Sequence, residues 1–191
     1  MENDLIKYLS QHTVLSEDMI RIISERSVIR SFKKGTLLLK EGDPVNECFL
    51  VLKGCIRSYM IIEGQEKSIE FFIEEQSVSP GNYGTDIPSE YYLECIEDTI
   101  VCAATPEMES EMFGIYPEIE SECRKIGEKM IADYQASYTN YKISSAEERY
   151  LNLMKHRPEL IQRVPQYQLA SYLGITPESL SRIRKRVAKK L

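Results

Sequence analysis

The hydrophobic period of this chain changes twice, and that change restricts the possible folds more than any other feature of the sequence. Between residues 28 and 104 the apolar residues come in short runs, separated by Gly, Pro, Asn and Asp at turns. Strands this short at such regular spacing predict an antiparallel β-roll or jelly roll, because no helix fits between them to build a parallel α/β sheet. The expected strands are residues 28–32, 36–39, 47–52, 55–62, 67–73, 91–97 and 99–104.

On both sides of this region the apolar residues recur every three or four positions, as in amphipathic helices. Ser16 suits the N-cap of one helix, and Ser145 with Glu148 forms a capping-box pattern at the start of another. Pro106 suits the first turn of a third helix, and the helix that Ser145 begins should end before Pro158. The expected helices are residues 4–11, 16–25, 106–113, 117–142 and 145–156.

The expected helix at 117–142 would be about 39 Å long, more than a small β-domain needs as cover. Its apolar stripe favours a coiled coil with a second copy of the chain, since Gly127, Ala132 and Ala136 would permit close approach. The alternative is that the stripe only packs on the β-roll. The expected interface residues are Ile119, Cys123, Ile126, Met130, Tyr134 and Tyr141, with Ser137 on the same stripe.

The segment at 164–187 has the pattern of two short helices joined by a tight turn. Ala170 is small enough for a close helix crossing, and Gly174 suits the left-handed conformation that ends a helix. Thr176 can cap the next helix, with Pro177 in its first turn. This pattern predicts a helix-turn-helix with a polar, basic outer face. The residues expected to face inward are Leu169, Ala170, Leu173, Leu180, Ile183 and Val187.

Charge divides the chain near residue 141. Residues 1–141 contain 13 Lys and Arg against 26 Asp and Glu, a net charge of −13, whereas residues 142–191 contain 11 against 4, a net charge of +7. A basic C-terminal module on an acidic body is typical of a nucleic-acid-binding protein. The alternative, an ordinary αα-hairpin with a solvated cationic face, does not explain why that face lacks the usual mixture of acids.

The order of β-roll, long helix and helix-turn-helix resembles the Crp/Fnr family of bacterial transcription regulators over nearly the whole chain. Gly42-Asp43 and the segment CFLVLKGCIR at 48–57 are similar to the barrel signature of that family. The resemblance implies an α+β fold, with an antiparallel, cyclic-nucleotide-binding-like β-roll sensor at 1–115, a dimerisation helix at 116–142 and a helix-turn-helix domain at 143–191. Because the chain stops soon after the second helix of that motif, we expect a winged-helix-like domain with a reduced wing.

The resemblance also places Glu178 and Arg182 where the family has base-reading residues. Glu is suited to accept from cytosine N4, and Arg to pair with guanine through two hydrogen bonds. The implied function is that of a homodimeric regulator that reads an imperfect palindrome in double-stranded DNA, with RNA polymerase a candidate partner and the small-molecule effector unknown. The candidate DNA-contacting residues are Gln166, Thr176, Glu178, Ser179, Ser181, Arg182, Lys185 and Arg186.

The sequence departs from the family pattern in three places. The arginine that holds a cyclic phosphate in relatives is absent, and Ser89-Glu90 puts an acid beside its place, which predicts an effector other than cyclic AMP. The first cysteine is Cys48, so the N-terminal cysteine cluster of the iron–sulfur branch is missing. Pro177 takes a position where many relatives carry a base-contacting arginine.

The remaining features of the sequence provide no sign of a metal site, a membrane span or an enzyme active site. The cysteines form no C-x-x-C pair and lie far in sequence from both histidines, so they are expected to be reduced and buried, with no metal site and no cofactor. No membrane-spanning apolar run or secretory signal is visible, which predicts a cytoplasmic protein. No nucleophile–base pair or Gly-rich phosphate loop indicates an enzyme. The alternative to a signal-dependent regulator is a ligand-independent DNA-binding protein with a vestigial β-roll. The five cysteines are Cys48, Cys55, Cys95, Cys102 and Cys123.

Overall fold

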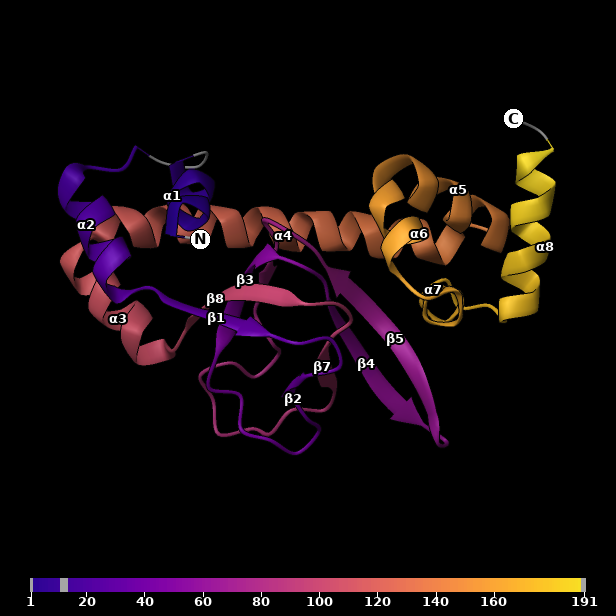
Figure 1. Cartoon of the computed structure of the whole chain (residues 1–191), viewed down its shortest axis with the longest axis horizontal. Coiled ribbons are helices and arrows are strands. Elements are labelled where there is room, and N and C mark those ends of the chain that lie inside the picture. The colour runs from indigo at the N-terminus through magenta and orange to yellow at the C-terminus, as the bar shows by residue number, and fades with distance from the viewer. Residues whose placement is uncertain (1, 11–13, 190–191) are drawn as a thin grey trace. The chain divides into compact units, whose positions relative to one another are not determined.

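A computed structural model describes residues 2–10 and 14–189 (Figure 1). The end of the first expected helix at Gln11, and His12 after it, lie outside the described residues. The chain divides into two compact units. Residues up to 58 together with 71–127 make the first unit, and residues 59–70 together with 128–191 make the second.

The β-region forms two four-stranded sheets, in the strand orders β1-β8-β3-β6 and β2-β7-β4-β5. The pairs β1–β8, β3–β8, β3–β6 and β2–β7 are antiparallel, which confirms the expected β-roll. All seven expected strands are present, with ends shifted by one or two residues. The short β6 was not predicted, because two residues carry no periodic pattern. The strands are β1 (Val28–Phe32), β2 (Leu37–Leu39), β3 (Cys48–Lys53), β4 (Ile56–Ile62), β5 (Gln65–Phe72), β6 (Ser77–Val78), β7 (Tyr92–Cys95) and β8 (Thr99–Ala104).

Alternate side chains of β3 and β8 fill the core of the β-roll. Phe49 and Val51 on β3 and Val101 and Ala103 on β8 are at most 3% exposed. Burying a side chain such as Val or Phe contributes about 1.5–3 kcal/mol to folding, so these alternating positions fix the register of both strands. The same core cluster also contains Leu39, Val45, Ile56, Val78, Leu93 and Cys95.

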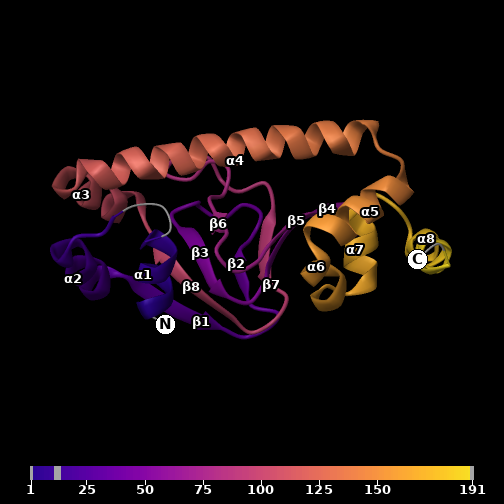
Figure 2. The same cartoon turned by 90° about the horizontal axis from the view of Figure 1, so that it is seen from above.

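The intervening side chains of β3 and β8 face a layer of helices. Leu50 and Cys102 pack against a second apolar cluster built around Leu5, Met19 and Ile23. The helices gather beside the β1-β8-β3 sheet and the beginning of α4 (Figures 1 and 2). Strands β3 and β8 are therefore covered on both faces, fully on the core side and partly on the helix side. The helices of this unit are α1 (Glu2–Ser10), α2 (Glu17–Arg26), α3 (Pro106–Ile115) and the first part of α4 (Pro117–Ile143).

The predicted helix starts are confirmed in the backbone. Ser16 Oγ accepts from Met19 N at 3.2 Å, and Pro106 occupies the first turn of α3. The long helix α4 is continuous over 27 residues. The expectation that the cysteines are buried is confirmed for Cys55 and Cys95, whereas Cys48 and Cys102 are partly buried. It is wrong for Cys123, which is exposed on α4.

The second unit contains the outer part of the β4–β5 hairpin, the rest of α4 and four further helices. Both hydrogen bonds of the predicted capping box are present at the start of α5, between Ser145 and Glu148. The short α6 was not predicted, because Pro158 was interpreted only as the end of a helix and not as the first residue of the next. The helices are α5 (Ala146–His156), α6 (Pro158–Arg163), α7 (Gln166–Tyr172) and α8 (Pro177–Ala188).

A polar cluster fixes the hairpin to α6 and α7 within this unit. Arg157 Nη1 donates to Glu70 Oε1 at 2.5 Å, and the two side chains are 21% and 17% exposed. Tyr172 Oη donates to the other carboxylate oxygen of Glu70 at 3.5 Å. Burial and the adjacent carboxylate raise the pKa of Tyr172 to about 12, so its hydroxyl remains a donor at neutral pH. Next to this cluster, Ser68 N donates to Ser171 Oγ at 2.9 Å.

Neither a membrane span nor a metal cluster is found among the described residues. Over residues 2–10 and 14–189, each helix is too short or too polar to cross a bilayer. Over the same residues, no three side chains of His, Cys, Asp or Glu gather in a way that could hold a metal ion.

The Glu70–Arg157 pair should stabilise the second unit measurably. Glu70→Gln leaves a mostly buried guanidinium without its counter-charge, so we expect the free energy of unfolding to fall by about 2–4 kcal/mol. Asp98→Asn is the control: it removes the charge of Asp98 from the exposed Lys33–Asp98 ion pair and should leave the urea concentration at half-unfolding nearly unchanged. Urea denaturation of both variants checks this, and equal midpoints for the two would contradict it.

Candidate nucleic-acid interface

A left-handed glycine makes the turn between α7 and α8. Gly174 has a φ of +68°, and its N–H donates to Ser171 O at 3.0 Å. Ile175 N donates to Ala170 O at 3.0 Å, which closes α7. A second constraint was not visible in the sequence: a Cβ at position 174 would collide with Tyr141 Oη at the end of α4. The backbone conformation therefore favours glycine, and any larger residue would also have to displace the Tyr141 hydroxyl.

Arg149 holds the surroundings of this turn together. Its guanidinium lies over the Tyr141 ring, 4.6 Å from the centroid. Its Nε donates to Leu173 O at 3.0 Å, and its Nη1 donates to Ser144 O at 2.8 Å. One side chain of α5 thus contacts the end of α4, the start of α5 and the last residue before the turn.

The start of α8 follows the predicted chemistry. Thr176 Oγ1 accepts from Ser179 N at 3.2 Å, and Pro177 is the first helical residue. Leu180, Ile183 and Val187 are buried. The inward face of α8 is therefore fixed, and the opposite face is left to solvent.

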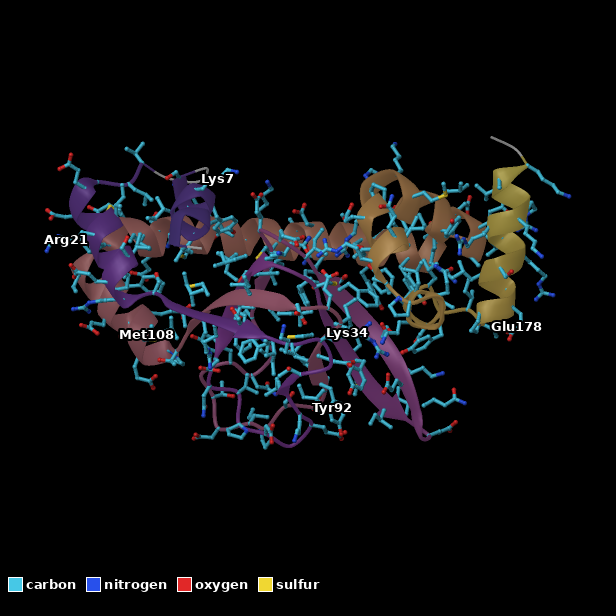
Figure 3. All side chains as sticks on the ribbon, viewed as in Figure 1. Lys7, Arg21, Lys34, Tyr92, Met108 and Glu178 are labelled. Atoms are coloured by element: carbon cyan, nitrogen blue, oxygen red, sulfur yellow. The ribbon has the colours of Figure 1, made fainter. Side chains whose placement is uncertain are left out.

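Glu178, Arg182 and Lys185 are exposed and lie on one side of α8, opposite the buried residues. Glu178 lies near the N-terminal end of the helix (Figure 3). Hydrogen bonds from its own backbone N–H and from Thr176, together with the charge of Arg182, lower the pKa of Glu178, so it is ionised at neutral pH. Arg182 Nη2 donates to Ser179 Oγ at 3.2 Å, which orients the guanidinium along the helix.

Two other predicted residues have partners within the protein. Arg186 forms an ion pair with Glu147 of α5, and Gln166 Oε1 accepts from Arg184 Nη1 at 2.5 Å. Arg184 was not among the expected site residues. No sequence pattern identifies it, because its contact with Gln166 joins positions that lie 18 residues apart.

A groove of about 540 Å³ runs along one flank of α8. From α8 it is lined by Ser181, Arg184 and Lys185, and on the opposite side by Tyr150 and Met154 of α5. Cationic and hydroxyl groups on one wall suit a phosphate-bearing ligand, for which arginine, lysine and serine are ordinary donors. The candidate interface is thus the outer face of α8 together with this flank.

The expected dimer stripe on α4 is divided between two environments. Ile119 packs against the cluster around Leu5, whereas Tyr134 and Tyr141 are 49% and 43% exposed. Ile131 and Tyr138, which were not predicted, are 61% and 63% exposed and extend the apolar surface beside the stripe. Unsatisfied apolar surface of this kind on one helix is typical of an interaction surface.

Ser89, which the sequence resemblance placed at the cyclic-phosphate position, is buried and hydrogen-bonded within the β-roll. Ser89 is 3% exposed; its Oγ donates to Tyr91 O at 2.8 Å and its N–H donates to Asp43 O at 2.9 Å. Its carbonyl accepts from Gly42 N at 2.8 Å. The polar groups of Ser89 are therefore all hydrogen-bonded, to Tyr91 and to the turn at Gly42 and Asp43, and Glu90 beside it is exposed.

Comparison with known proteins matches the β-region to a family model and most of the chain to transcription regulators. The family model for the cyclic nucleotide-binding domain matches residues 29–113. Electron transport regulator A of Shewanella oneidensis is 25% identical over 185 residues, which cover 90% of this chain and 72% of that protein. The transcriptional activator protein anr of Pseudomonas aeruginosa is 26% identical over 186 residues, covering 90% of this chain and 74% of the relative.

Solved structures show the same fold. FixK2 from Bradyrhizobium japonicum superposes with a TM-score of 0.68 at 18% identity, covering 86% of this chain and 85% of that one. CLP from Xanthomonas campestris, described as a c-di-GMP responsive global regulator, superposes with a TM-score of 0.66 at 17% identity. The superposition covers 97% of this chain and 91% of the CLP chain.

Substituting the turn glycine should separate the two constraints on it. Gly174→Ala should lower the free energy of unfolding by about 2–4 kcal/mol, since left-handed strain and overpacking each cost roughly 1–2 kcal/mol or more. Gly64→Ala is a matched control, because Gly64 has a φ of +74° with open space around it and should show the strain alone.

The contribution of the collision can be recovered separately. Adding Tyr141→Phe to Gly174→Ala removes the clashing oxygen and leaves the ring carbon at 3.6 Å from the new Cβ, an ordinary contact. Urea denaturation of the wild type and the three variants measures both contributions to the free energy of unfolding. Equal losses for Gly64→Ala and Gly174→Ala would show that Tyr141 does not restrict the turn.

Proposed function

We propose that this chain, a homologue of the Crp/Fnr-family regulators that carries their cyclic nucleotide-binding domain, is a homodimeric, sequence-specific DNA-binding transcription regulator whose β-roll responds to a signal other than cyclic AMP. Its curated relatives are transcription regulators and not enzymes. One observation carries the proposal: the Gly174 turn and the buried face of α8 leave Glu178, Arg182 and Lys185 together on the solvent side. Such a regulator acts in the cytoplasm, with RNA polymerase as a candidate partner.

In this proposal, residues in the N-terminal half of α8 contact the base edges. Glu178 is ionised and so can accept from cytosine N4, and Arg182 can donate two hydrogen bonds to guanine. Pro177 has no side-chain donor, so the base opposite it should be weakly specified. Thr176 and Ser179 are used in the cap and in supporting Arg182, which positions the reading groups.

Phosphate contacts fall to the cations further along the helix. Lys185 is exposed on the same side as Arg182, and Arg184 extends the cationic surface along the groove. Arg186 is held by Glu147, so its contribution to phosphate binding should be smaller than that of Lys185. This division supports a reader in which α8 supplies both specificity and charge.

Dimerisation through α4 would bring two copies of α8 to one DNA. The apolar seam would consist of the exposed Tyr134 and Tyr141 together with Ile126 and Met130, which are half-buried. Two readers in successive major grooves, about 34 Å apart, require a target with two inverted half-sites.

The first test is selection of sites from randomised DNA. The wild type should enrich an imperfect palindrome, and Arg182→Ala should lose about 1–3 kcal/mol at that site and relax preference at one base pair per half-site. Lys185→Ala is the matched comparison: it should weaken binding to all sequences and reduce the salt slope by roughly one unit. Identical preferences for wild type and Arg182→Ala would exclude Arg182 from the readout.

The second test concerns the seam. Changing Ile126 and Met130 to Asp would bury like charges at the interface and cost several kcal/mol, roughly enough to dissociate a micromolar dimer. Lys125→Asp with Lys129→Asp is the control, because each position lies one residue earlier, about 100° round the helix. Sedimentation equilibrium should show a monomer for the first pair and a dimer for the second. A monomeric wild type would contradict the proposal.

The third test concerns the signal. Cyclic AMP should not bind at micromolar concentration, because losing a charge-assisted phosphate contact costs about 1.5–3 kcal/mol and Glu90 adds repulsion. Calorimetric titration of the wild type with cyclic AMP measures this directly, and saturable micromolar binding would refute it.

A further inference from the structure

The first unit contains an apolar cavity on the helix-covered side of its sheet. It has a volume of about 200 Å³ and lies among α1, α2, α3, the start of α4 and the edge of β8. Met108 of α3 belongs to its lining (Figure 3). The proposed DNA-binding surface has no residue in it, and neither does the loop around Ser89.

The lining is almost entirely hydrocarbon and sulfur. Cys102 and Ala104 come from the helix-facing side of β8, and Cys123 comes from α4. Burial raises the pKa of the Cys102 thiol, so it stays uncharged at neutral pH. The larger apolar side chains of the lining are Leu5, Leu9, Ile23, Met108, Met112, Phe113 and Ile119.

The charged residues of the lining already have partners. Arg26 and Glu111 form an ion pair with each other, and both are about half exposed. Glu109 accepts from the Cys48 thiol at 3.5 Å. A charged ligand would therefore have to break one of these contacts or enter hydrocarbon surroundings without a counter-charge, which is costly.

The pocket is partly open to solvent, so a small molecule can enter it, and its apolar lining contacts water when it is empty. Its volume of about 200 Å³ has room for one small ring system, since an apolar cavity of about 150 Å³ is enough to bind benzene. Sulfur atoms at a ring edge make favourable contacts, and Met108, Met112, Cys102 and Cys123 place four of them around this space.

We propose that this cavity is a binding site for a neutral, apolar ligand of the size of one or two aromatic rings. The site shares no residue with the loop around Ser89, and it stands whether or not the chain binds DNA. Because Ile119 and Cys123 belong to the first turns of α4, an occupant would contact the helix to which we assign dimerisation.

Calorimetric titration of the full-length wild type in the absence of DNA tests the site. Toluene and indole should bind saturably with one molecule per chain, and benzoate, the charged counterpart of toluene, should bind at least about tenfold more weakly. Ala104→Leu fills the cavity from β8 and should weaken toluene binding at least about tenfold. Ala146→Leu, the same change at the start of α5, should leave it unchanged. Wild type without saturable binding of either probe would overturn the proposal, as would equal affinity in Ala104→Leu.

Methionine methyl NMR locates the bound probe without any substitution. On titration with toluene, the resonances of Met108 and Met112 should shift, whereas those of Met60 and Met154 should not, because they line no part of the cavity. This readout decides the matter even if Ala104→Leu fails to fold. Shifts confined to Met154, which lines the groove beside α8, would place the ligand there and refute the assignment. DNA-site selection tests the proposed function separately, so the ligand site and the DNA-binding function can each be refuted without affecting the other.

Discussion

The second unit depends on the contacts of a single side chain, Arg149. Its guanidinium stacks on Tyr141 and donates to the carbonyls of Leu173 and Ser144, so it satisfies helix-end acceptors while joining three elements. These contacts hold the end of α4 against the turn at Gly174, where a Cβ would displace the Tyr141 hydroxyl. The position of α8 relative to α4 within this unit follows from that close approach.

The first unit depends on a different constraint, the alternation of side chains in β3 and β8. Phe49 and Val101 face the core between the sheets, while Leu50 and Cys102 face α1, α2 and α4. A one-residue slip would exchange the two sets, so the register is determined by both cores at once. The helix-facing core is less completely filled, and that is where the apolar cavity lies.

Five cations of the second unit illustrate two different roles. Arg149 lies over the Tyr141 ring, Arg157 pairs with Glu70, and Arg186 pairs with Glu147. These three charges therefore mainly stabilise the fold. Arg182 and Lys185 are exposed on α8, where a phosphate or a base edge could reach them. The net charge of the sequence does not distinguish these five residues, whereas the proposal of nucleic-acid binding rests on the second group.

What the sequence determined by itself is local: the strand alternation, the caps at Ser16, Ser145 and Thr176, and the glycine turn at Gly174. Each depends on residues within a few positions of one another, so the pattern is readable along the chain. The tertiary structure alone decided the Arg186–Glu147 pair, the Arg184–Gln166 contact, the Glu70–Arg157 pair and the cavity behind β8. These features join residues 18 to 118 positions apart, and no local period encodes them, because tertiary packing determines which distant side chains meet.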